Sequence, residues 1–253
     1  MTMIPKYKIS LHVHTKYSPD SLLPFRLLYW QCQKQQIDCI AITDHNTAEG
    51  ALAFQAYCAR KASQRYSLQV IAGEEIMTTG GEIIGLFLTD TIPSGLTPEA
   101  TIKAIKSQGG IVYIPHPYEE KRRRSVLKEQ YIASNQSQID CMECHNGRNT
   151  KRSRSAKQAQ LVAKYGLLPV IGEDAHTVWE LGRNTMLIKE LPSDKASFIR
   201  CLQTAEFGQP RYAGAIHHLT KIDRILKFVL RGDFRGLYRF IHDRIVQNLP
   251  KMV

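Results

Sequence analysis

Residues 9–15 read Ile-Ser-Leu-His-Val-His-Thr and place two histidines, one residue apart, at the end of an apolar run. This alternation predicts a β-strand, in which residues two apart point to the same face. His12 and His14 can therefore contact one ion, and neutral imidazole is the commonest protein ligand of divalent transition metals. A single His-x-His pair also occurs by chance on a surface, so its meaning depends on the rest of the chain.

Four further apolar runs are followed by side chains of the kinds that commonly bind metal ions. The residues that follow these runs are, in chain order, Asp44 and His45, Glu74 and Glu75, His116, and Asp174 and His176. Each one alone would be a loop histidine or an acid at a helix start. Parallel β/α folds bring the carboxyl ends of their strands to one rim, where active sites form. Together the five strand ends predict a metal site.

Five motifs span roughly residues 8–190, and by them the chain resembles the PHP (polymerase and histidinol phosphatase) superfamily of metal-dependent phosphoesterases. They are, in order, Leu11-His12-Val13-His14-Thr15 with Ser18 and Asp20, Thr43-Asp44-His45-Asn46, Gly73-Glu74-Glu75, His116-Pro117, and Asp174-Ala175-His176. The resemblance implies an α/β fold, a distorted seven-stranded (β/α) TIM-like barrel of PHP type, here with a C-terminal helical extension. It also implies two or three divalent ions at the mouth of the barrel.

The resemblance also implies a ligand set. His12, His14, Glu75 and Asp174 would hold one ion, Glu75 and His116 a second, and Asp20, His45 and His176 a third. Many relatives supply a further histidine to the second ion, but residues 46–115 of this chain contain no histidine, and Glu82 is the candidate substitute. We expect Glu74 to point away from the ions and Asp44 to support a ligand. The role of Glu173 is open. The mixed nitrogen and oxygen ligands suit Mn²⁺, Zn²⁺ or Fe²⁺.

The implied reaction is hydrolysis of a phosphate monoester or diester by attack of a hydroxide held by the ions. Asp174 and His176 are the candidate catalytic residues, and the leaving group takes its proton from His176 or from a water. Arg148 is expected to bind the substrate phosphate. Arg123 and Arg124 either do the same or belong to a solvated loop.

The resemblance implies that the substrate is a phosphorylated small molecule or a short nucleic acid. The net charge of +11 suggests polyanionic partners. The compact chain, Asp20 where some relatives carry histidine, and the basic rim favour a nucleotide or oligonucleotide, as for a nucleoside 3′,5′-bisphosphate phosphatase or a 5′–3′ exonuclease. Tyr118 and Trp179 are the candidate aromatic residues for base stacking. The alternatives are a phosphatase of histidinol-phosphate type and a non-catalytic PHP scaffold or nucleic-acid-binding module.

The pattern predicts a PHP domain over residues 1–205, with parallel β/α units. Helices are expected at 24–36, 48–62, 97–108, 125–134, 150–165 and 194–204. The six cysteines are scattered; Cys141 and Cys144 would face opposite sides of a strand, so we expect ordinary thiols in a cytoplasmic protein. The sequence shows neither a signal-peptide core nor a membrane-spanning stretch.

Residues 206–253 are expected to form a linker followed by basic amphipathic helices. Apolar residues recur at helical spacing from Ile222 to Leu230 and from Leu237 to Ile245, beside six Lys or Arg residues between Arg224 and Arg244. Such helices either pack on the barrel, pair with a second copy, or bind an anionic membrane surface. The oligomeric state is left open.

Overall fold

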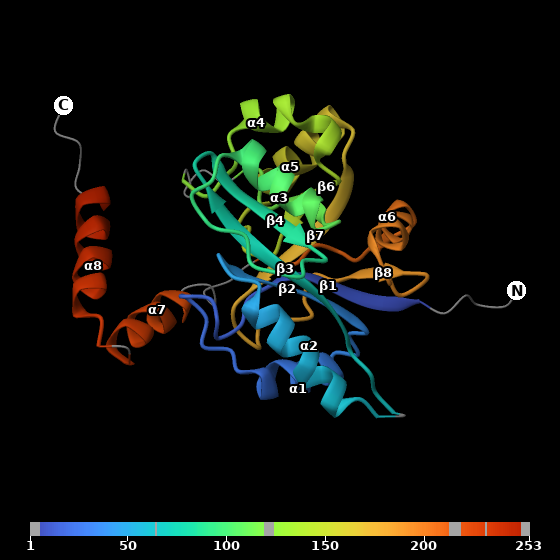
Figure 1. The fold of residues 1–253 in the computed structure, drawn as a ribbon, viewed down its shortest axis with the longest axis horizontal. Helices are drawn as coiled ribbons and strands as arrows, with labels where there is room; N and C mark the ends of the chain where they lie inside the picture. The colour runs from blue at the N-terminus through green and yellow to red at the C-terminus, as the bar shows by residue number, and fades with distance from the viewer. Residues whose placement is uncertain (1–5, 64, 119–123, 213–218, 231, 249–253) are drawn as a thin grey trace, which may run out of the picture.

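The computed structural model describes residues 6–63, 65–118, 124–212, 219–230 and 232–248. Seven strands form a closed barrel in the order of the chain (Figure 1). They are β1 (Tyr7–Val13), β2 (Cys39–His45), β3 (Gln69–Thr78), β4 (Gly81–Leu86), β5 (Ile111–Ile114), β6 (Cys141–Asn146) and β7 (Leu168–Ala175). Because β1 pairs with both β2 and β7, the ring closes and the predicted seven-stranded barrel is confirmed.

All six predicted helices of the PHP region are present. They are α1 (Phe25–Lys34), α2 (Glu49–Lys61), α3 (Pro98–Ser107), α4 (Glu129–Ser134), α5 (Arg152–Tyr165) and α6 (Lys195–Gln203), with a short 3₁₀ turn at Gln136–Gln138. Helix α4 starts four residues later than expected, because the backbone of the preceding segment bonds the β3–β4 turn instead. Lys128 donates to the Gly80 carbonyl, and Ser125 accepts from the Glu82 N–H.

The prediction of parallel units throughout was wrong at β4. This strand follows β3 in a tight hairpin and is antiparallel to both β3 and β5. Gly81 has φ of +129° at the turn, where an added Cβ would lie 2.4 Å from the Leu127 backbone. Since β4 runs in the opposite direction, the start of this strand, with Glu82, lies at the rim where the parallel strands end.

Three apolar clusters hold the barrel. One fills its interior, with Leu11 and Tyr113 fully buried, and includes Phe198 and Leu202 of α6. A second lies between β1–β3 and helices α1 and α2, and the third between β3–β6 and helices α3 to α5. All six cysteines are free thiols, as expected; Cys141 belongs to the interior cluster, while the Cys144 thiol donates to the Val170 carbonyl.

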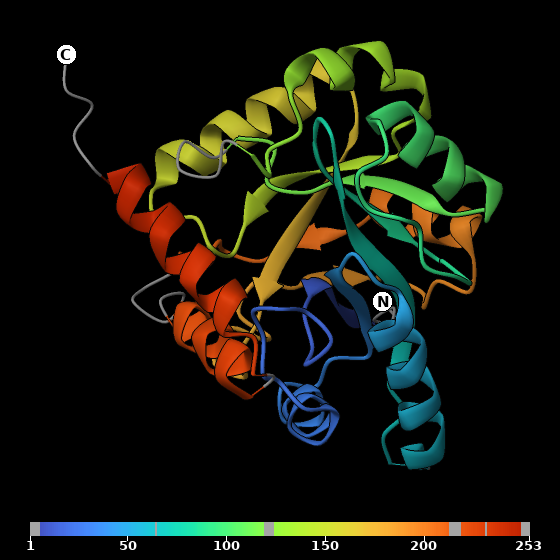
Figure 2. The same cartoon turned by 60° about the vertical axis from the view of Figure 1, so that its left-hand side comes forward.

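The chain after α6 remains in contact with the barrel. Strand β9 (Glu206–Phe207) pairs with β8 (Met186–Ile188), which pairs with the first half of β1, so the predicted linker begins with a short strand. Arg211 exchanges backbone hydrogen bonds with the Asn184 side chain. Helices α7 (Leu219–Leu230) and α8 (Phe234–Asn248) follow, and both lie on one side of the barrel (Figure 2). Within the described residues, none of the helices combines the length and apolar character needed to cross a membrane.

Candidate metal centre

The predicted ligands meet at the mouth of the barrel. Their side chains form four overlapping groups with ligand atoms within 4.8 Å of one another: His14, His45 and His176; His12, His14 and Asp174; His12, Glu75 and His116; and His45, Glu75 and Glu82. Asp20 lies beside them, with Oδ1 3.3 Å from His176 Nε2 and Oδ2 3.6 Å from His45 Nε2. All nine predicted metal ligands therefore gather in one place.

A local irregularity in β1 turns His12 toward this place. The pairing of β1 with β2 gains one residue between Ser10 and Val13, and His12 has φ of +63°. Leu11 packs in the barrel interior, whereas Val13 packs outside it under the helices. Such a bulge reverses the faces of the residues that follow it. His12 and His14 share a face as predicted, but they reach the interior through the bulge and not through regular alternation.

Two further candidate ligands have strained backbones. Asp174 has φ of +50° at a matching irregularity in β7, and His116 has φ of +29° just after β5. Positive φ is costly for residues with a Cβ and persists only where the surrounding structure enforces it. Positive φ at three of the nine candidate ligands supports a functional role for this rim.

Hydrogen bonds fix the tautomers of three imidazoles. Nδ1 of His12 lies 2.7 Å from a Glu143 oxygen, and Nδ1 of His176 lies 3.0 Å from the Asp174 carbonyl; both partners can only accept. Nδ1 of His14 lies 3.0 Å from Ser18 Oγ. Because the Ser18 hydroxyl donates its hydrogen bond to Asp44, its oxygen accepts from His14. We infer that all three imidazoles carry their proton on Nδ1 and present a bare Nε2.

The centre therefore consists of acceptors that face one another. Nε2 of His12, His14 and His176 is buried and lacks a hydrogen-bond partner among the described residues. Glu75 Oε2 lies 3.3 Å from Nε2 of both His12 and His14. Lone pairs at these distances repel unless a cation lies between them, and buried polar groups are otherwise nearly always satisfied. The donor set thus fits divalent metal ions.

Glu75 is the carboxylate common to several groups. Its Oε1 lies 3.0 Å from His116 Nε2, and its Oε2 lies 3.1 Å from His45 Nδ1. Its two oxygens face different imidazoles, which is the arrangement expected of a carboxylate that bridges two ions.

Glu82 lies within reach of the same space. Its oxygens are 3.3 Å from His116 Nε2 and 3.8 Å from His45 Nδ1. Glu74, by contrast, points away and accepts from the Ile92 N–H, as strand alternation predicted. Glu173 also takes no part in the centre: it accepts from Ser10 Oγ and from the backbone N–H groups of Gly182 and Asn184, and so holds the loop after β7.

Sequence reasoning missed Glu143, the supporting carboxylate of the centre. It is fully buried on β6 and accepts four hydrogen bonds, from His12 Nδ1 (2.7 Å), Tyr113 Oη (2.6 Å), the His116 N–H (2.6 Å) and Asn146 Nδ2 (2.8 Å). Burial would raise the pKa of this carboxyl, but His12 lowers it below its usual value. The signal that could have found it is an acidic residue, Glu143, in the middle of an otherwise apolar predicted strand.

Asp44 supports a candidate ligand, as expected, and that ligand is His14. It accepts from the Thr15 N–H, from Thr15 Oγ1 and from Ser18 Oγ, and Ser18 in turn contacts His14. His45, its chain neighbour, is linked to it only through the backbone N–H bond to Ser18.

The structure places one of the three predicted phosphate ligands at the centre. The Arg148 side chain is largely buried, with Nε 3.6 Å from Asp174 Oδ1 and Nη2 3.5 Å from Glu180 Oε1. Arg124 is exposed in a turn, and Arg123 lies outside the described residues. Within the described part of the chain Arg124 does not contact the centre, so its phosphate role stays a prediction.

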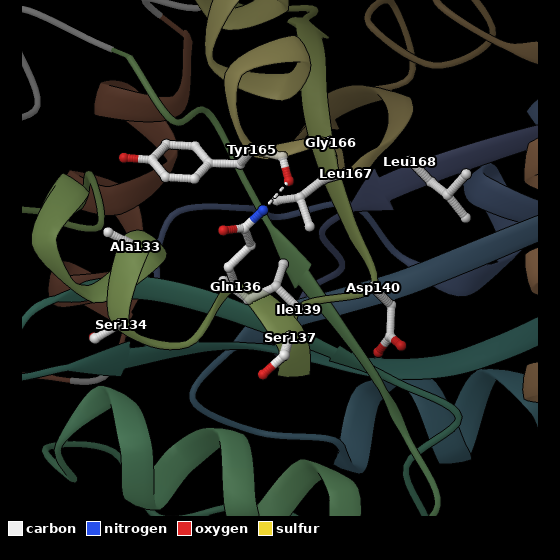
Figure 3. A pocket seen from close by; sticks show the side chains of 10 residues that line it. All are labelled: Ala133, Ser134, Gln136, Ser137, Ile139, Asp140, Tyr165, Gly166, Leu167 and Leu168. Atoms are coloured by element: carbon white, nitrogen blue, oxygen red, sulfur yellow. Dashed lines mark hydrogen bonds between the residues drawn. The ribbon is translucent and has the colours of Figure 1, made fainter.

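A separate cavity of about 510 Å³ lies at the other end of the barrel (Figure 3). It is lined by residues that precede β6 and β7, among them Asp140 and Leu167, and Gln136 Nε2 donates to the Tyr165 carbonyl across it. None of the predicted ligands lines it.

A family model for the PHP domain matches residues 10–172, and the chain belongs to the PHP domain family. The chain is 34% identical over 190 residues to the uncharacterized protein MJ0417 of Methanocaldococcus jannaschii. The matched region covers 74% of this chain and 73% of that protein. The chain is 46% identical over 121 residues, 44% of this chain and 68% of the relative, to the uncharacterized protein MJ1587 of the same organism.

The fold is similar to that of a two-domain protein from Bacteroides vulgatus that contains a predicted PHP-like metal-dependent phosphoesterase. The TM-score is 0.63 at 18% identity, over 80% of this chain and 65% of that one. This chain therefore spans just under two thirds of the length of that protein, and the likeness supports the fold.

Proposed function

We propose that the chain is a hydrolase of phosphate esters that uses two or three divalent ions. One observation carries this proposal: the buried Nε2 atoms of three imidazoles lack a hydrogen-bond partner among the described residues and face carboxylate oxygens. His12, His14, Glu75 and Asp174 would hold one ion, Glu75, His116 and Glu82 a second, and Asp20, His45 and His176 a third. Such ions, here Mn²⁺, Zn²⁺ or Fe²⁺, lower the pKa of water and offset charge on phosphate oxygens.

Arg148 would bind the phosphate of the substrate. Its guanidinium already lies beside the carboxylates of Asp174 and Glu180, which orient it at the edge of the centre. Glu180 is itself held by the backbone N–H groups of His176 and Thr177. A fixed guanidinium can pair with two phosphate oxygens, which positions the phosphorus and offsets charge in the transition state.

His176 would donate the proton that the leaving oxygen needs. Its Nδ1 is tied to the Asp174 carbonyl, so Nε2 is the atom that faces the substrate. Asp20 Oδ1, 3.3 Å from this Nε2, would stabilise the protonated imidazole. This assignment applies when the third ion is absent, because the same nitrogen is also a candidate ligand.

A nucleotide or a short oligonucleotide is the substrate class that we favour. Trp179 follows His176 in the loop after β7 and is 63% exposed, so its ring is available for stacking on a base. The ring of the other aromatic candidate, Tyr118, lies 4.4 Å from the Lys157 ammonium. We assign catalysis to residues 1–205, with residues 206–253 as an appendage, and place the protein in the cytoplasm because all six of its thiols are free.

Phosphate release by the Mn²⁺-loaded protein tests this proposal. The substrates are adenosine 3′,5′-bisphosphate, histidinol phosphate and a 5′-phosphorylated dinucleotide, with Asp174→Ala as the control. Release from either nucleotide, lost in the variant, would support the proposal as stated. Release from histidinol phosphate alone would keep the hydrolase and reject the nucleotide substrate. Metal binding without any release would favour the binding-module alternative.

A further inference from the structure

Helix α7 contacts the barrel through its polar residues. Lys227 is 7% exposed, and its ammonium donates hydrogen bonds to the backbone carbonyls of Lys16 and Ser18 in the β1–α1 loop. The Asp223 carboxylate accepts from the Leu22 N–H of the same loop at 3.4 Å. Residues four apart lie on one side of a helix, so the polar side of α7 is the one that covers the barrel.

The apolar side of α7 is consequently turned away from the barrel. Five of its residues recur at helical spacing and are exposed, Leu230 to 76%; they are Ile222, Ile225, Leu226, Val229 and Leu230. An amphipathic helix of a globular protein ordinarily buries such a stripe against its own core. Here the helix is docked the other way round, which leaves the stripe available to an external partner.

Helix α8 extends this apolar surface. Phe234 is 67% exposed, Tyr238 is 69% exposed, and Ile241 one turn further along is exposed as well. The two helices contact each other through the rings of Phe228 and Phe240, whose centroids are 5.9 Å apart. Contact between the helices therefore does not cover these residues. We call the eight exposed apolar residues of α7 and α8 the apolar stripe.

The charge of the two helices distinguishes between partners. Residues 219–248 contain seven Lys or Arg residues and three Asp residues. Arg235 and Arg239 are exposed on α8, close along the chain to Phe234 and Tyr238. A second copy would bring two basic surfaces together, whereas anionic lipid headgroups would neutralise them. Exposed phenylalanine and tyrosine rings beside arginines also suit the boundary between headgroups and acyl chains.

We propose that α7 and α8 bind an anionic membrane surface. The apolar stripe enters the boundary between headgroups and acyl chains, and the arginines pair with lipid phosphates. Lys227 and Asp223 keep the barrel attached to the opposite side of α7, next to the loop that carries Ser18. This proposal does not depend on the reaction assigned to the metal centre.

The test is cosedimentation of the full chain with vesicles of phosphatidylcholine and phosphatidylglycerol, and with vesicles of phosphatidylcholine alone. We expect binding to the anionic vesicles that weakens as salt is added. The double variant Leu226→Gln/Leu230→Gln should lose about tenfold or more in affinity, because each leucine leaves water on binding. Arg235→Gln and Arg239→Gln should each cost about fivefold at low salt.

Trp30→Gln is the matched control, since Trp30 is a similarly exposed apolar side chain on α1, and it should bind as the unaltered chain does. All variants change exposed residues, and thermal unfolding equal to that of the unaltered chain would show that they are folded. If the double variant is not folded, Tyr238→Gln replaces it in the test. Equal partition of the double variant and the unaltered chain would overturn the proposal. Two other results would also overturn the proposal. One is that the chain does not bind vesicles and forms dimers through the same residues, and the other is that it binds nucleic acid but not lipid.

Discussion

Replacing Glu143 by Gln should weaken both the fold and the metal centre. The carboxylate accepts two hydrogen bonds on Oε1, from His12 and Tyr113, and two on Oε2, from the His116 N–H and Asn146. Glutamine keeps the shape but replaces one oxygen with a donor. Two of the four donors would then face an NH₂ group inside the protein.

The magnitude follows from these contacts. A buried donor without an acceptor costs about 1–3 kcal/mol, so two of them cost about 2–6 kcal/mol of unfolding free energy. Asn146 can turn its amide to accept from the new NH₂ group, at the expense of its bond from the Arg148 N–H, which favours the lower half of this range. Replacing the carboxylate that accepts from His12 Nδ1 with a neutral amide should also weaken metal binding about 10- to 100-fold.

Urea unfolding of the EDTA-treated protein measures the first effect, and metal titration measures the second. Glu173→Gln is the control, because Glu173 is also a buried carboxylate with three hydrogen bonds but contacts none of the imidazoles of the centre. It should lose stability and keep metal affinity within a few-fold. Unchanged metal affinity in Glu143→Gln would mean that Glu143 does not support the metal ligands.

The pH dependence has a definite sign. The pKa of Glu143 lies below its usual value in the folded protein, so its carboxylate contributes stability that is fully present above about pH 4.3, the usual value for a glutamate. That contribution is lost as the pH falls through the folded-state pKa. The difference in unfolding free energy between the unaltered chain and Glu143→Gln should therefore shrink in acid, and a difference that grows there would contradict this account.

Three other substitutions have distinct expected outcomes. Arg148→Gln should raise KM or lower kcat by about 10- to 100-fold, from loss of charge-assisted hydrogen bonds to phosphate, with unchanged metal content. Glu82→Gln should lower the occupancy of one ion, as measured by elemental analysis, and an unchanged metal content would remove Glu82 from the site. Lys227→Met keeps the apolar stem but loses the ammonium that bonds the loop of Ser18, so the unfolding free energy should fall by about 2 kcal/mol; an unchanged value would mean that α7 is not docked there.

The position of the metal centre could be predicted from the sequence because it depends on local order. Each strand is a short apolar run, and its ligands follow at once, as with His116 after residues 111–114. Parallel strands in a barrel then bring these ends to one rim. The flanking helices could be predicted for the same reason, since their apolar periodicity is a local feature. The closed seven-stranded barrel was implied by the resemblance to the PHP superfamily.

The remaining features depend on contacts between distant segments. The bulge that turns His12 inward is decided by pairing with β2 and β7, and the reversal of β4 by the close packing of Gly81 on the Leu127 backbone. Glu143 supports His12 across 131 positions of chain, which only the folded barrel brings together.

The C-terminal helices show the same division between sequence and structure. Helical spacing reveals an apolar stripe on α7, and its existence needs no tertiary information. Which side of that helix meets the barrel was decided by Lys227 and Asp223, which bond backbone groups of the β1–α1 loop. Periodicity specifies the faces of a helix, but only the hydrogen bonds available on the neighbouring surface determine which face is buried.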